Sequence, residues 1–331
     1  MSSLPIEVLY SQSFKNNSSL FKDKTLFQTA KIASKITNSH GSKTINKNCV
    51  LKEGEEIGEG IVIDKYLFEG KESLFYLGKI SSINSEILIK SFSYEKKHSS
   101  IILKIKQDFE KVKEIIGDNI ISYFDYQIDA NKKVCQIFME YIPNGISLQK
   151  YFKKYNADKP KNSGLPIKQI KQIIKGILTG LKILHGEGIY PGNINPENII
   201  VDKDLSKIKI INYALKIRKD EILTSPYYSA SKKVFMKFLP EYEYENDIWS
   251  IGCITFELFC GYCPYYKIPP HEAACCLAQY ISPIEAANED IKDIFYDKKN
   301  RMVLDFLNQC FRNNDGSRPQ AADLLKHKFL N

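Results

Sequence analysis

The amino-acid sequence predicts an α+β protein in which a smaller, strand-rich part precedes a larger, helical part. Residues 57 to about 92 alternate between apolar and polar types and are rich in β-branched residues, with turn-forming residues in between. Residues 167–185 and 247–259 instead have the apolar spacing or the length of buried helices. The change of pattern falls near the Pro-Asn-Gly at 143–145, which we expect to be a hinge.

The remaining segments fit the same division. Residues 101–116 have helical spacing, and two more strands are expected around 121–128 and 133–141. Residues 1–48 are rich in Ser, Asn and Lys, and they predict a basic, flexible N-terminal extension. An amphipathic helix at 19–36 is the alternative.

Charge and hydropathy exclude several classes of protein. The formal net charge is +8, and residues 1–48 hold seven lysines against two acidic residues. No cluster of Lys and Arg with interleaved aromatic residues occurs, so no nucleic-acid partner is expected. No segment reaches the roughly 18–20 apolar residues of a membrane span, and the first residues lack the pattern of a signal peptide. We therefore expect a cytoplasmic protein without a membrane partner.

The cysteines raise the question of a metal site. Cys260 and Cys263 are followed by the adjacent Cys275 and Cys276. Two adjacent cysteines fit poorly into one zinc tetrahedron, and free cysteines commonly pack as small hydrophobic residues. We predict buried thiols and no metal site.

Seven motifs occur in a fixed order along the chain. They are ILIK (87–90), MEYIPNG (139–145), LHGEGIYPGNINPENIIV (184–201), KIINYAL (209–215), SPYYSASK (225–232), NDIWSIGCITFELFCGYCPY (246–265) and DGSRPQAADLLKHKFL (315–330). In this order they resemble motifs of the eukaryotic protein kinase superfamily, from the lysine strand through the catalytic loop to the closing helices. The resemblance implies a two-lobed kinase-like domain at 49–331, with a small antiparallel-sheet N-lobe at about 57–141, a hinge at 142–145 and a helical C-lobe at 146–331.

The resemblance places asparagine at both positions where a kinase has a catalytic aspartate. Asn193 stands at the position of the base, and an amide oxygen is too weakly basic to take a proton at neutral pH. Asn212 stands where an aspartate holds magnesium, an ion that prefers anionic oxygens. Asn195 replaces the loop lysine. The resemblance therefore implies a degenerate catalytic site.

The positions that resemble a nucleotide site are altered as well. By family spacing, Gly70 is the one glycine left in the loop that covers the phosphates. Phe75 and Leu88 replace a valine and an alanine next to the adenine ring, and Ile200 matches the residue that closes the pocket. A close-packed site does not accept larger side chains without displacing something. Our hypothesis is that these side chains fill the adenine site, so we expect no cofactor and leave ATP and magnesium open.

Other positions keep the residue type of the family. Lys90 matches the lysine that contacts the phosphates, and Asp108 is its expected helix partner, with Glu110 as the alternative. Asn198 matches a metal-binding asparagine. We interpret the Lys90–carboxylate pair and Asn198 as structural braces, because the rest of the phosphate site is missing.

Four further positions follow from the resemblance. Met139 and Tyr141 are remnants of the nucleotide site at the hinge. Asp247 and Arg318 match residues of the C-lobe that brace loops, so we expect structural roles for both.

These substitutions predict a pseudokinase that is not an enzyme and acts as a scaffold or an allosteric regulator. Its expected partner is a protein, either an active kinase or the substrate of one. A Ser/Thr protein kinase of low activity that uses Lys90 and Asn198 is one alternative. A peripheral membrane or effector protein that acts through residues 1–48 is another. The oligomeric state is not predicted.

Overall fold

The computed structural model describes residues 9–10, 49–57, 60–69, 73–94, 99–160, 163–213, 228, 243–266, 268, 273, 276, 281–312 and 318–331. The chain divides into two compact units. The first comprises residues 1–116 and 121–146, and the second comprises residues 117–120 and 147–331.

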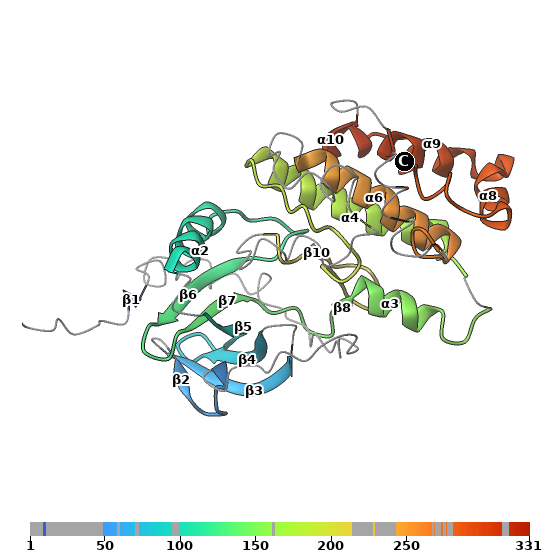
Figure 1. Cartoon of the computed structure of the whole chain (residues 1–331). Helices are drawn as coiled ribbons and strands as arrows, with labels where there is room; N and C mark the ends of the chain where they lie inside the picture. The colour runs from blue at the N-terminus through green and yellow to red at the C-terminus, as the bar shows by residue number, and fades with distance from the viewer. Residues whose placement is uncertain are drawn as a thin grey trace, which may run out of the picture. The chain divides into compact units, whose positions relative to one another are not determined.

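The first unit is built on a seven-stranded sheet in the order β1-β6-β7-β5-β4-β3-β2 (Figure 1). Every neighbouring pair of strands is antiparallel. The strands are β1 (Leu9–Tyr10), β2 (Glu56–Ile57), β3 (Ile61–Glu69), β4 (Leu74–Ile80), β5 (Ser85–Ser93), β6 (Tyr123–Asp129) and β7 (Val134–Glu140).

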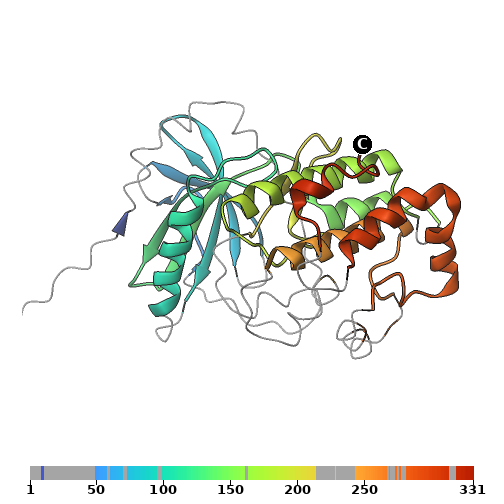
Figure 2. The same ribbon diagram turned by 90° about the horizontal axis from the view of Figure 1, so that it is seen from above.

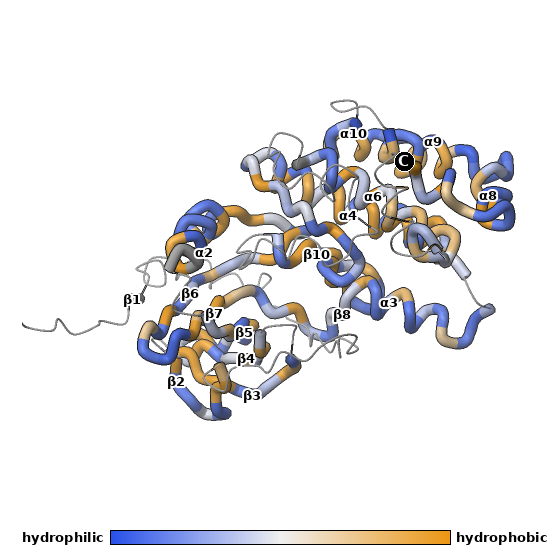
Figure 3. The backbone as a smooth tube through the Cα atoms, in the orientation of Figure 1, coloured by the Kyte–Doolittle hydropathy of each residue, from blue (hydrophilic) through white to orange (hydrophobic). Residues whose placement is uncertain are grey.

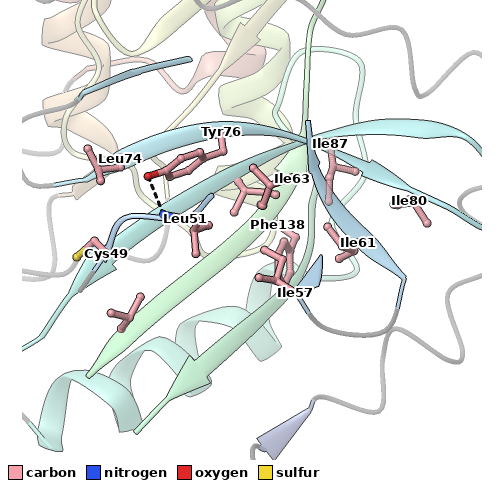
Figure 4. Packing of buried hydrophobic residues seen from close by; sticks show 12 residues of the cluster. Cys49, Leu51, Ile57, Ile61, Ile63, Leu74, Tyr76, Ile80, Ile87 and Phe138 are labelled. Carbon is pink, nitrogen blue, oxygen red and sulfur yellow. Dashed lines mark hydrogen bonds between the residues drawn. The ribbon is translucent and has the colours of Figure 1, made fainter. Parts of the chain in front are cut away.

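One face of this sheet carries a compact apolar core (Figure 4). Alternate residues of a strand point to the same face, so Ile87 and Ile89 of β5 join Phe138 of β7 in this cluster. The Tyr76 hydroxyl, also in the cluster, accepts a hydrogen bond from the backbone N–H of Leu51 at 3.1 Å. The segment before β2 is thereby held over the sheet.

The opposite face carries the helix α2 (Ser99–Val112) beside β6. The rings of Phe109 in α2 and Tyr126 in β6 lie edge to face, with centroids 4.9 Å apart. Tyr126 is opposite Ile137 of β7, and Ile137 is opposite Lys90 of β5. Because residues directly opposite each other share a face of the sheet, Lys90 projects on the side that α2 covers.

The second unit is mainly helical (Figures 1 and 2). Its elements are α3 (Leu148–Tyr155), α4 (Ile167–Gly186), α6 (Glu243–Cys260), α8 (Glu289–Tyr296), the 3-10 helix η7 (Lys298–Asn300), α9 (Arg301–Cys310) and α10 (Ala321–Leu324). A small sheet of β10 (Ile208–Ile210), β9 (Ile199–Val201) and β8 (Ile146–Ser147) accompanies them. In Figure 3 the tube of α8 is coloured mostly hydrophilic, whereas α6 carries many hydrophobic residues.

The helix α4 is the centre of this unit and packs closely on β10. Ile173, Ile177 and Leu181 are fully buried along one face of α4. A Cβ at Gly180 would lie 2.6 Å from the backbone oxygen of Asn119. The glycine permits a contact between backbones that no side chain would allow. The same Asn119 oxygen accepts the backbone N–H of Ile210 in β10 at 2.9 Å, two residues before Asn212.

The predicted α+β fold class is confirmed, with a strand-rich first unit and a helical second unit. The predicted helices at 167–185 and 247–259 form α4 and α6. The alternative helix at 19–36 lies outside the described residues. In the part of the chain that the structure describes, no helix has the length and apolar character needed to cross a membrane.

Candidate active site

Lys90 occupies the middle of β5 in the first unit. Its backbone is opposite Phe75 of β4 and Ile137 of β7. Its charge also acts on Cys135: burial raises the pKa of the Cys135 thiol, and Lys90 offsets part of that rise. The lysine is therefore anchored in the sheet, on the face that α2 covers.

The expected helix partners of Lys90 have other ion pairs. Asp108 is paired with Lys104 at 2.5 Å, one helical turn away in α2. Glu110 is paired with Lys113, also at 2.5 Å. Residues three or four apart are neighbours on a helix surface, so each carboxylate meets a lysine close to it in sequence. The expected pairing of Lys90 with Asp108 or Glu110 stays a prediction, and each carboxylate has a local lysine partner as well.

The sheet face around Lys90 is rich in large apolar side chains. The rings of Phe68 and Phe75 are stacked, with centroids 4.5 Å apart. Leu88 is only 2% exposed and lies opposite Leu77 and Met139.

The other residues expected near the nucleotide are placed as follows. Tyr141 is 6% exposed just after β7. Ile200 is buried in β9 of the second unit. Gly70 lies outside the described residues.

Four asparagine side chains form one hydrogen-bonded network in the second unit. The amide nitrogen of Asn195 donates to the side-chain oxygen of Asn193 at 2.8 Å. That of Asn198 donates to the backbone oxygen of Asn193 at 2.9 Å. That of Asn212 donates to the side-chain oxygen of Asn198 at 3.0 Å. The four asparagines, which the sequence identified separately, are thus joined by hydrogen bonds into one network.

Local backbone geometry explains two residue types in this region. Asn212 has a φ of 55° and Gly192 a φ of 60°, both in the left-handed region. Glycine adopts this conformation without steric cost, and asparagine tolerates it better than most residues do. Gly192 also donates its backbone N–H to Asp247. An arginine at position 192 would strain the loop.

Asp247 of α6 binds the start of the asparagine loop. Its carboxylate is fully buried, and it accepts the N–H of Gly192 at 2.7 Å and contacts His185 Nε2 at 2.9 Å. These contacts connect α6, the end of α4 and the asparagine loop. Arg318 donates to the backbone oxygen of Glu245 at 3.3 Å and lies over the Trp249 ring at 5.1 Å.

A second polar contact on α6 was not expected from the sequence. The Tyr228 hydroxyl donates to a side-chain oxygen of Glu257, and Ser250 Oγ donates to the Tyr228 backbone oxygen at 2.6 Å. Burial raises the pKa of Glu257 to about 7. The sequence showed Glu257 only as one charge in an apolar segment, and no motif points to a tyrosine partner.

The network does not fit the magnesium ion that the resemblance implies. The Asn198 side-chain oxygen already accepts the amide of Asn212, and both groups are neutral. Magnesium favours anionic oxygens in octahedral geometry. Elsewhere among the described residues, no group of three or more His, Cys, Asp or Glu side chains could hold a metal ion.

A strand-borne lysine followed by a helical unit with a braced asparagine loop has the architecture of a protein kinase. Residues 62–330 match the protein kinase domain family. The chain therefore belongs to this family.

Similar proteins carry kinase names. MAP3K epsilon protein kinase 1 of Brassica napus is 28% identical over 308 residues, which cover 90% of this chain and 21% of that protein. Mitogen-activated protein kinase kinase kinase A of Dictyostelium discoideum is 26% identical over 312 residues, or 92% of this chain and 30% of that protein. A serine/threonine-protein kinase of Saccharomyces cerevisiae is 24% identical over 302 residues, or 89% of this chain and 19% of that protein. The chain thus spans about a fifth to a third of the length of these relatives.

The prediction that the chain is not an enzyme is contradicted by these relatives, which are named as protein kinases. The prediction equated the loss of two carboxylates with the loss of the reaction. Phosphoryl transfer depends mainly on positioning and on stabilisation of charge. An amide can still position a group, so the two substitutions do not by themselves establish the loss of the reaction.

Proposed function

We propose that this chain is a Ser/Thr protein kinase of low intrinsic rate that uses Lys90 and Asn198. The membership in the protein kinase domain family carries this proposal. The position of Lys90 in β5 and the hydrogen-bonded loop of Asn198 support it.

Each group has a definite task in this proposal. Lys90 supplies a positive charge to the phosphates of a nucleoside triphosphate, which is the substrate. Asn198 holds the loop through the backbone oxygen of Asn193, and the Asn193 side chain orients the hydroxyl that accepts the phosphoryl group. A new bond forms between the hydroxyl oxygen and the γ-phosphorus as the bond from that phosphorus to the nucleoside diphosphate breaks, and the hydroxyl proton passes to water because Asn193 cannot take it.

The low rate follows from the missing base. General acid–base catalysis contributes about 10²–10⁴-fold in enzymes. A kinase with an amide at this position retains positioning and charge but lacks this factor. In this proposal the degenerate catalytic site expected from the sequence lowers the rate of transfer but does not abolish the reaction.

The proposed partner is a protein. Two of the relatives are named as MAP3K or mitogen-activated protein kinase kinase kinases, and by analogy we propose a kinase, or the substrate of one, as the protein that this chain binds and modifies. A cytoplasmic location accords with this role and is part of the proposal.

Transfer of label from ATP tests the function. Purified protein comprising residues 1–331 is incubated with labelled ATP, a generic protein substrate and either magnesium or manganese chloride. Lys90→Ala should abolish incorporation, because it removes the charge that acts on the phosphates. Lys79→Ala is the matched control, since Lys79 lies on β4 of the same sheet but pairs with Asp64 at 2.6 Å on the surface.

Two results would overturn the proposal. One is the absence of incorporation by the wild type with either metal, while an active kinase labels the same substrate. The other is equal incorporation by the wild type and Lys90→Ala, which would assign the activity to a contaminant.

A further inference from the structure

The contact between Asn198 and Asn212 joins two segments that are distant in sequence. Besides the amide bond between their side chains, the backbone N–H of Ile211 donates to the backbone oxygen of Asn198 at 2.9 Å. The residue before Asn212 and Asn212 itself therefore both bind the same asparagine. This double contact fixes the end of the asparagine loop to the chain that leaves β10.

Because both side chains are neutral amides, Asn198 and Asn212 can bind each other directly, without a bridging ion. An amide offers both a donor and an acceptor, so Asn212 can donate to Asn198 directly. A carboxylate at position 212 is an acceptor only, and its oxygen would face the Asn198 oxygen without a hydrogen atom between them. Two facing oxygens repel each other, and a cation between them relieves that repulsion.

The next bond in the network points to the same conclusion. Asn198 uses its own amide nitrogen for the backbone oxygen of Asn193 at 2.9 Å. Turning the Asn198 side chain to free its oxygen would break this second bond. The network thus favours one direction for the Asn198 amide, in which its side-chain oxygen accepts the Asn212 amide where an ion would otherwise bind.

We infer that the amide of Asn212 takes the place of a divalent cation in holding this loop, so that the chain folds and keeps its loop geometry without binding magnesium. The inference rests on the hydrogen bonds of the network and not on the proposed kinase activity.

Substitutions at position 212 test it by thermal unfolding of the full chain with manganese or magnesium chloride alone, at constant ionic strength and without nucleotide. The wild type should show the same melting temperature with and without metal. Asn212→Asp should melt lower than the wild type in metal-free buffer, and millimolar manganese should raise its melting temperature. Asn212→Ala should melt lower as well, but without any response to the metal.

Asn84→Asp is the matched control for the added charge. Asn84 is exposed in the turn between β4 and β5 and has a φ of 49°, close to that of Asn212. The variant gains the same negative charge in the same backbone conformation, far from the network in sequence and in the other unit. It should show no response to manganese.

A metal-dependent rise in the melting temperature of the wild type that Asn212→Ala abolishes would overturn the inference, because the amides would then be ligands. An Asn212→Asp variant that is as stable as the wild type in metal-free buffer would overturn the inference too. The hydrogen bond from Asn212 to Asn198 would then contribute nothing to stability. Neither outcome bears on the kinase proposal, since no nucleotide and no transfer reaction are involved.

Discussion

A single buried side chain, Asp247, organises the candidate active site at the scale of the residue. It has no exposed surface, accepts the backbone N–H of Gly192 at the start of the asparagine loop and contacts His185 near the end of α4. A buried carboxylate is stable only when its oxygens are satisfied. The contacts with Gly192 and His185 therefore both stabilise the buried Asp247 carboxylate and hold the asparagine loop in place.

We expect Asp247→Ala to lower the free energy of unfolding by about 3 kcal/mol, because it leaves the Gly192 N–H and His185 without their shared acceptor. Urea denaturation measures this loss. Asp305→Ala is the matched control: Asp305 pairs with His327 at 3.1 Å, but its side chain is 63% exposed. The control should change the stability by less than about 1 kcal/mol. Equal losses in the two variants would contradict the role given to Asp247.

The residue scale also shows what the sequence could predict. Motif spacing selected Asn193, Asn195, Asn198 and Asn212 individually, because each occupies a position that carries chemistry in the family. It did not predict that they bind one another, since side-chain hydrogen bonds depend on rotamers and backbone turns. For the same reason it did not predict that Lys104 pairs with Asp108 within the helix.

At the scale of the element, α6 carries a carboxyl group that should titrate near neutral pH. Glu257 is hydrogen-bonded to Tyr228, and burial raises its pKa from the ordinary value of 4.5 to about 7. The folded protein then binds this proton more tightly than the unfolded chain does. Its contribution to stability is full below pH about 4.5 and is lost as the pH rises to about 7.

The wild type should therefore lose up to about 3 kcal/mol of stability between pH 4.5 and 7 relative to Glu257→Gln, since one pKa unit corresponds to about 1.4 kcal/mol. Glutamine keeps an acceptor for Tyr228 but does not titrate. Urea midpoints across this pH range measure the difference. Glu289→Gln, at an 83% exposed side chain of α8, should follow the wild type. Parallel curves for wild type and Glu257→Gln would refute the shift.

The strand β5 leads to a second prediction at this scale. By the resemblance, Leu88 and Phe75 take up the space of the adenine ring, and Leu88 is almost fully buried. Leu88→Ala should then raise the affinity for ATP at least about tenfold by opening space for a ring. The affinity for inorganic tripolyphosphate, which has no base, should not change.

Binding is measured by calorimetry on the folded protein with each ligand. Ile89→Ala is the control, because Ile89 is equally buried but belongs to the core cluster on the opposite face. If Leu88→Ala destabilises the fold too far, Phe75→Val serves the same purpose. Wild-type protein that already binds ATP far more tightly than tripolyphosphate would show that the adenine site is open.

At the scale of the whole molecule, the fold was more predictable than the activity. Hydrophobic period and length identify β3, β4, β5, α4 and α6, because burial of one face selects these patterns over many residues. The proposed activity depends on a few individual groups, among them Lys90 and Asn193. The size of their effect on the rate cannot be predicted from residue type alone.

Restoring the base at position 193 should show how far its absence lowers the rate. Asn193→Asp should raise the rate of phosphoryl transfer by about 10²-fold, the lower end of what a general base supplies. The assay is the labelled-ATP experiment under saturating nucleotide, with Asn84→Asp as the control for added charge. An unchanged rate would mean that the loop does not bring position 193 to the accepting hydroxyl.

The asparagine network has a consequence for the handling of the protein itself. Asparagine is among the thermolabile residues, and loss of its side-chain ammonia by hydrolysis yields aspartate. If Asn193→Asp is about 10²-fold faster, a preparation in which about one molecule in a hundred has deamidated at this position would show twice the true rate. The hydrogen bonds of Asn195 and Asn198 to Asn193 restrain the loop against this reaction. Intact mass and peptide mapping, by the one-dalton gain of deamidation, should therefore accompany every measurement of activity.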